Sequence, residues 1–274
     1  MYIKEAVRNA ELIDAEMQTA DSARSLIRAE HRAAALIKSF DIGLAASFAD
    51  KAVERARALL AEYDNTDTRE SLGAALRERG QIAEKQEDWD LARKCADESV
   101  DMYKADSGEE AEAAQENNIL YSEMTILKSL FNNGEFDKAF PMLKECLGRA
   151  RTQMLDYPGV ISLNIYDNFI DMPFTQNNGW DRPEYMEILN GERMATIFMT
   201  HDDPLVLAQA EGECRGMCYE MQGMLRFYSG DSIGGLRDMR TAQDVYRKTF
   251  DKTGHAFFAN KADRIDQMIE ISTS

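Results

Sequence analysis

The sequence predicts an all-α fold, and three observations support that prediction. Residues of high helix propensity, among them Ala, Glu, Leu, Arg and Met, are abundant, while only 5 of the 274 residues are proline. No alternating run of β-branched and polar residues is long enough to predict a strand. Apolar residues instead recur at three- and four-residue spacing between short polar turns, which is typical of amphipathic helices packed on a core.

Turn signals divide the first half of the chain into six expected helices. Each turn combines Asp or Asn with Gly, Ser or another residue that favours a turn or a helix cap. Asp21 or Ser22 is expected to cap the second helix, and Asn65 lies in a turn that we expect to cap the fourth. The turns fall at residues 41–43, 64–67, 87–90 and 106–108, and they bound helices expected over 3–19, 21–40, 44–63, 68–86, 91–104 and 109–132.

The second half contains a further six expected helices and one irregular stretch. Pro173 is expected to begin a loop that runs through Asp181, longer than the roughly two to eight residues usual between packed helices. The loop is therefore either functional or an insertion. The helices of this half are expected over 136–155, 160–172, 182–199, 204–228, 232–250 and 255–271, which brings the total to about twelve.

A spacing of about 47 residues recurs along the chain. Small residues that would let paired helices approach follow the proposed turns at Ala45, Ala92, Ala139 and Gly235, separated by 47, 47 and 96 residues. The missing member falls near Trp180. Large apolar residues stand three positions before most of these sites, at Ile42, Trp89, Phe136 and Trp180. A large residue at the turn and a small one at the crossing is what a tight antiparallel helix pair requires.

Two of these turns resemble the signature of the tetratricopeptide repeat family, namely Gly134-Glu135-Phe136-Asp137-Lys138-Ala139 and Glu87-Asp88-Trp89-Asp90-Leu91-Ala92. The resemblance implies a right-handed superhelix of about five antiparallel hairpins. It implies one domain over 1–274, with an N-terminal helix in 1–20, hairpins in 21–250 and a capping helix in 255–274. The unit is longer than the roughly 34 residues of the standard repeat, as in the helical-repeat domains of peptide-sensing bacterial regulators.

A repeat scaffold of this kind binds its partners along the concave face, which the first helix of each hairpin lines. Amide side chains on that face could hold a peptide backbone, and Arg or Lys could hold carboxylates. For any single residue, an ordinary solvated helix face is the alternative explanation. The residues expected on this face are Glu30, His31, Arg77, Gln81, Tyr121, Lys128, Asn132, Asn168, Glu220 and Met224.

The leading functional hypothesis is a non-catalytic scaffold that binds a protein or peptide segment. The alternative is a regulatory domain that senses a small ligand around residues 156–200, where Asn178 and Trp180 would contribute to the site. No nucleophile elbow, P-loop or dinucleotide-binding motif is present, so we expect no catalytic residue and no cofactor. Cys214 and Cys218 lie four apart without further ligands nearby, so we expect no metal site.

Charge and cysteine usage restrict the partners and the compartment. The formal net charge is −17 and is spread along the chain, so we expect neither nucleic acid nor a membrane surface as a partner. A basic partner would suit this charge, although solubility alone explains it. The cysteines show no disulfide framework, and no leader or spanning segment is evident, which favours the cytoplasm. The helix at 255–271 could cap the array or pair two copies in a homodimer.

Overall fold

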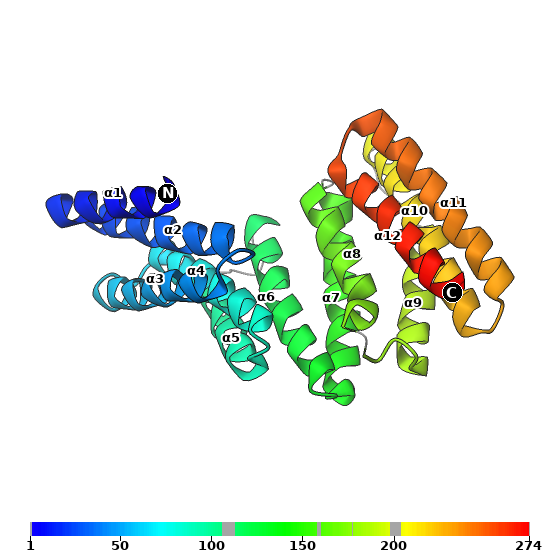
Figure 1. Cartoon of the computed structure of the whole chain (residues 1–274), viewed down its shortest axis with the longest axis horizontal. Helices are drawn as coiled ribbons and strands as arrows, with labels where there is room; N and C mark the ends of the chain where they lie inside the picture. Colours follow the sequence, from blue (N-terminus) through cyan, green and yellow to red (C-terminus); the bar gives the residue numbers. More distant parts are fainter. Residues whose placement is uncertain (1, 106–112, 158–159, 177, 198–203, 274) are drawn as a thin grey trace. The chain divides into compact units, whose positions relative to one another are not determined.

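The computed structural model of the protein describes residues 2–105, 113–157, 160–176, 178–197 and 204–273. These residues form twelve α-helices and no strand, so the all-α prediction is confirmed (Figure 1). The first six helices are α1 (Tyr2–Met17), α2 (Ala20–Ile37), α3 (Ile42–Glu62), α4 (Thr66–Lys85), α5 (Trp89–Lys104) and α6 (Ala113–Asn132). The other six are α7 (Phe136–Asp156), α8 (Val160–Thr175), α9 (Pro183–Ile197), α10 (Pro204–Tyr228), α11 (Ser232–Thr253) and α12 (Ala256–Thr273).

The helices begin and end close to the turns that the sequence predicts. Asn65 caps α4 as expected, since its side chain accepts a hydrogen bond from the Thr68 backbone N–H at 3.1 Å. Helix α2 is capped differently. Thr19, and not Asp21 or Ser22, is the cap residue, and Ser22 completes a capping box by bonding back to the Thr19 N–H at 3.1 Å.

Pro173 does not begin a loop. Helix α8 continues through Thr175, and Pro173 lies in its last turn. A proline there removes a single backbone donor without disturbing a following helical turn, because the helix ends two residues later. The irregular stretch is therefore shorter than the sequence suggests, and it separates Thr175 from the start of α9 at Pro183.

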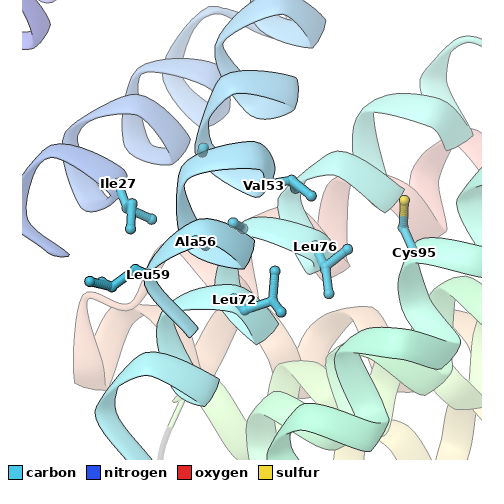
Figure 2. Close-up of a cluster of buried hydrophobic side chains, with 9 residues drawn as sticks. Ile27, Val53, Ala56, Leu59, Leu72, Leu76 and Cys95 are labelled. Carbon is cyan, nitrogen blue, oxygen red and sulfur yellow. The ribbon is translucent and has the colours of Figure 1, made fainter. Parts of the chain in front are cut away.

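The chain divides into two compact units, Met1–Asn133 (unit 1) and Gly134–Ser274 (unit 2). In unit 1 each helix contacts the next one along the chain, and α2 also contacts α4, as α4 does α6. Figure 2 shows one of its apolar clusters, in which side chains of four consecutive helices meet. The labelled residues are Ile27 of α2, Val53, Ala56 and Leu59 of α3, Leu72 and Leu76 of α4, and Cys95 of α5.

Unit 2 contains close helix crossings at glycines of α10. A Cβ added at Gly216 would lie 2.4 Å from the Tyr246 ring of α11, and one at Gly223 would lie 3.1 Å from the Gly235 carbonyl oxygen of the same helix. The structure shows the crossing, which lets the α10 and α11 backbones approach more closely than a side chain would allow.

Candidate binding site

Three of the residues expected on a binding face come together in unit 1. His31 lies on α2, Arg77 on α4 and Tyr121 on α6. Helix α4 contacts both α2 and α6. The Arg77 guanidinium stands 5.8 Å from the centre of the Tyr121 ring, within the range of a cation–π contact. His31 and Arg77 line a common cavity. Helices α2, α4 and α6 therefore place His31 and Arg77 in one cavity and Tyr121 against Arg77.

The cavity has a volume of about 190 Å³. Its polar walls come from Arg24, Arg28 and His31 on α2, Arg77 on α4 and Asn118 on α6. Ile27, Ala74 and Tyr103 supply apolar surface in the same walls. A group that combines a charged end with methylene carbons would match both kinds of surface.

Three arginines dominate the charge of this cavity. Arg24 forms ion pairs with Asp21 and Asp67, and Asp67 is itself part of the lining. Among the residues that the structure describes, neither Arg28 nor Arg77 forms an ion pair, and Arg77 donates a hydrogen bond to the Asn118 side-chain oxygen. Glu70 is the other carboxylate in the walls. Two guanidinium groups are thus available to an incoming anion.

The neighbouring arginines also act on His31. Its burial and the positive charges of Arg77, Arg32 and Arg28 lower the pKa of the imidazole to about 4. The ring is therefore neutral near pH 7, so one of its nitrogens can donate a hydrogen bond and the other can accept one.

Three other expected residues of unit 1 are held by hydrogen bonds within the chain. The Gln81 side-chain oxygen accepts from Lys38 at 2.7 Å, Lys128 bonds to Glu84, and Asn132 donates to the Lys128 carbonyl oxygen at 2.9 Å. They remain half-buried or exposed. A partner would have to compete with these internal bonds, so they are weaker candidates than the residues of the cavity.

Two acidic residues expected on the binding face are buried instead. Glu30 is fully buried and accepts a hydrogen bond from Arg55 of α3 at 3.1 Å. Glu220 is 2% exposed and lies within the core of unit 2. Both side chains join helices of this chain to one another, and neither is accessible to a partner.

Of the two other expected residues in unit 2, Met224 on α10 is buried as well. Asn168 is exposed on α8 and bonds to Asn164 of the same helix at 2.7 Å. Unit 2 therefore supplies one accessible member of the predicted set.

Glu220 belongs to a cluster of ionised groups that sequence inspection did not find. Lys261 of α12 pairs with Asp167 and Asp171 of α8 and, at 2.7 Å, with Glu220 of α10. Arg264 pairs with Asp171 and, at 2.8 Å, with Glu220. The three acids and Lys261 are each at most 8% exposed, so the cluster lies in the core.

The charges of this buried cluster influence one another strongly. Burial raises the pKa of Asp167 to about 7, and Lys261 only partly opposes that rise. Burial acts in the same direction on Glu220, but Lys261 and Arg264 outweigh it and hold the pKa of Glu220 below its ordinary value. Lys261 and Arg264 pair with the three acids, so the cluster supplies its own counter-charges and holds α8, α10 and α12 together.

The loop residues proposed for a small ligand do not line a cavity described for this region. Asn178 is half-buried and Trp180 is 40% exposed. Arg182, which follows them, lies 4.4 Å from the centre of the Phe136 ring. Arg182 and Phe136 line a cavity of about 380 Å³, and Phe136 with Glu184 and Ile188 lines another of about 420 Å³, neither of which includes Asn178 or Trp180.

The apolar side of the last helix faces the interior of unit 2. Phe257, Phe258 and Ile265 are buried, and the Phe258 ring lies 6.4 Å from that of Tyr246 on α11. These three side chains are not available for contact with a second copy.

The cysteines and acidic residues in the described part of the chain form no group able to hold a metal ion. Cys95 is a buried free thiol, while the side chain of Cys214 lies outside the described residues. No helix in the described ranges has the length and apolar character needed to cross a membrane.

Sequence inspection missed Arg24, Arg28 and Asn118, which complete the cavity in unit 1. It also missed Asp167, Asp171 and Lys261. The distance of a residue from its turn predicts which residues of a helix face the binding surface. It does not predict which side chains of neighbouring helices lie beside them. A residue-by-residue alignment of the first half of the sequence with the second would have paired these positions.

Comparison with known proteins supports the fold and leaves the function open. No protein-family model matches the chain, and no curated protein matches it. Among solved structures, the chain is similar to the crystal structure of BtubC (BKLC) from P. vanneervenii. The two have a TM-score of 0.58 and 12% sequence identity over 90% of this chain and 89% of that one. At this level of identity the likeness shows a similar helical fold.

Proposed function

We propose that this chain is a helical-repeat protein, similar to the tetratricopeptide repeats, that binds a protein or peptide segment and has no catalysis of its own. The segment would lie on the face of unit 1 formed by α2, α4 and α6. The observation that carries the proposal is the convergence of His31, Arg77 and Asn118 from these three helices at one polar cavity, with the Tyr121 ring against Arg77. A mixture of aromatic, arginine and amide groups is typical of peptide-binding surfaces.

The packing of unit 1 supports the repeat interpretation. Successive hairpins in a helical array bring their first helices into mutual contact, and α2, α4 and α6 have that relationship. The acidic composition and the cysteines, whose spacing shows no disulfide framework, suit a protein of the reducing cytoplasm.

Selection from a random peptide library tests the proposal on the full chain. Selected peptides should bind the wild type and should bind the Arg77→Ala/Tyr121→Ala variant at least roughly tenfold more weakly, since both side chains are in the proposed site. Arg57→Ala is the control, because Arg57 lies on α3, outside the face, and pairs with Glu98 at 2.6 Å. Equal binding to both variants, or no enrichment above an unrelated helical protein of similar charge, would refute the proposal.

A small-ligand site in unit 2 is the second candidate. The observation in its favour is the Arg182–Phe136 contact beside a cavity of about 380 Å³ in the region that follows the irregular stretch. A thermal-shift screen of metabolites should then find a compound that stabilises the wild type and has no effect on Arg182→Ala. A compound that stabilises both proteins equally would exclude this site.

A further inference from the structure

Units 1 and 2 contain the same internal contacts at positions 143 residues apart. In unit 1, a Cβ at Gly73 would meet the Tyr103 ring at 3.0 Å, and in unit 2 one at Gly216 would meet the Tyr246 ring (216 − 73 and 246 − 103 are both 143). A Cβ at Gly80 would lie 3.2 Å from the Ala92 carbonyl oxygen, and Gly223 has the same relation to Gly235 at 3.1 Å.

Polar contacts follow the same offset. Asp88 accepts a hydrogen bond from the Leu91 N–H at 3.1 Å, and Asp231 accepts one from the Gly234 N–H at 2.9 Å. The ion pair of Lys104 with Glu123 at 3.5 Å corresponds to that of Arg247 with Asp266 at 2.8 Å. Each residue of the second set is 143 positions after its counterpart in the first. We infer that α1–α6 and α7–α12 are equivalent, and that residues separated by 143 occupy the same place in their units.

The offset pairs the cavity of unit 1 with the buried ion cluster of unit 2, and the charges are reversed. Arg24, Arg28 and Arg77 correspond to Asp167, Asp171 and Glu220. The two cations of the cluster correspond to neutral residues, Asn118 in place of Lys261 and Tyr121 in place of Arg264.

The contacts at these positions are kept although the residue types differ. Arg77 bonds to Asn118, as Glu220 contacts Lys261 at 2.7 Å. Arg77 also lies against Tyr121, at the position where Glu220 pairs with Arg264. The cavity of unit 1 and the ion cluster of unit 2 therefore have the same arrangement of contacts, but they differ in their balance of charges.

In unit 2, Lys261 and Arg264 balance the acidic residues of the cluster. In unit 1, the arginines of the cavity are balanced only in part. Asp67 pairs with Arg24, and Glu70 adds one carboxylate to the walls. Arg28 and Arg77 form no ion pair within the described residues, and an open cavity exists where unit 2 has a lysine side chain. Guanidinium groups held close to one another repel, and a bound carboxylate would relieve that repulsion.

We propose that the cavity of unit 1 binds glutamate or aspartate side chains of an acidic peptide segment, at the place that Lys261 takes in unit 2. The apolar part of the walls, from Ile27, Ala74 and Tyr103, would pack against the methylene groups of such a side chain. This assignment rests on the proposed function and names the chemistry of the partner. The favoured segment is acidic, in contrast to the basic partner that the net charge alone would suit.

Fluorescence anisotropy with the full chain and three labelled peptides of one length tests this assignment. The peptides carry Glu, Gln or phosphoserine at the same positions. The Glu peptide should bind at least roughly tenfold more tightly than the Gln peptide, because each charge-assisted pair is lost in the amide. Arg28→Gln and Arg77→Gln should remove that preference, whereas Arg57→Gln, with the same change of charge on α3, should keep it.

The outcomes separate this inference from the proposed function. If Glu and Gln peptides bind equally and Tyr121→Ala weakens both, the face binds peptides and the acidic preference is refuted. If the phosphoserine peptide binds best, the carboxylate assignment is wrong and the ligand is a phosphate. If Arg57→Gln reduces binding as much as Arg77→Gln, binding follows overall charge and the cavity is not the site. If none of the three peptides binds and the library selection also fails, both proposals are refuted.

Discussion

The Lys261 ammonium group lies 2.7 Å from the Glu220 carboxylate, and both side chains are almost fully buried in the core of unit 2. Removing the Lys261 cation would take one of the two counter-charges from the buried carboxylates and leave them with Arg264. Lys261→Met should therefore lower the free energy of unfolding by about 3–5 kcal/mol, the range for one partner lost from a buried ion pair. Denaturant titration of the full chain measures it. Lys248→Met, at an exposed site on α11, is the control and should change stability by less than about 0.5 kcal/mol. A small effect at Lys261 would contradict the ion cluster.

Asp167 should make stability depend on pH. Its pKa is raised from 3.8 to about 7 in the folded protein, so the native state holds an extra proton between these values. The associated stability is complete below pH 4 and is lost as the pH rises through 7. The wild type should thus lose roughly 1–3 kcal/mol relative to Asp167→Asn between pH 4 and pH 8, since the amide cannot ionise. Denaturant titrations across this range measure the difference. Parallel pH profiles for the two proteins would show that Asp167 is already ionised at acidic pH.

The close crossing of α10 and α11 should not tolerate a methyl group at Gly216. A Cβ there would lie 2.4 Å from the Tyr246 ring, which is itself fully buried and cannot move aside. Gly216→Ala should destabilise the protein by about 2–4 kcal/mol through overpacking. Gly148→Ala on α7 is the matched control, because nothing lies within 4 Å of its added Cβ. That variant should be more stable by about 0.5–1 kcal/mol, since alanine favours the helix. Equal melting temperatures for the two variants would contradict the crossing.

Arg77 should control the titration of His31. Burial and the charges of Arg77, Arg32 and Arg28 hold the pKa of the imidazole at about 4, and Arg77 is the largest of the three charge effects. Arg77→Gln should raise that pKa, and Arg57→Gln should leave it unchanged. Histidine proton shifts recorded by NMR between pH 3 and pH 8 give the values. If the pKa of His31 in the Arg77→Gln variant equals that of the wild type, the Arg77 and His31 side chains are not close to each other.

Helix positions were predictable because local signals determine them. Asp and Asn caps, glycine at turns and apolar spacing act over a few residues, so α3, α4 and α11 begin close to where the sequence indicates. Two details depended on context. Thr19 replaces Asp21 and Ser22 as the cap of α2, and α8 continues past Pro173 because a proline in the last turn costs little.

The binding face was predictable only in part. The spacing placed His31, Arg77 and Tyr121 on neighbouring helices, where His31 and Arg77 line one cavity and Tyr121 contacts Arg77. The same counting placed Glu220 on an accessible face, although Lys261 of α12 and Tyr246 of α11 bond to it in the core of unit 2. Burial depends on side chains many residues away in the sequence, which a local pattern does not include.

The pKa of His31 in the presence of an acidic peptide is the most direct test of the proposed site. Arg28, Arg32 and Arg77 surround the ring with positive charge, while Asp67 and Glu70 are the carboxylates of the cavity walls. A bound carboxylate would offset the arginines and favour the protonated imidazole. NMR titration of the full chain should show the pKa rising from about 4 when the Glu peptide is saturating and staying there with the Gln peptide. An unchanged His31 pKa in the presence of a tightly bound Glu peptide would show that the acidic segment binds elsewhere.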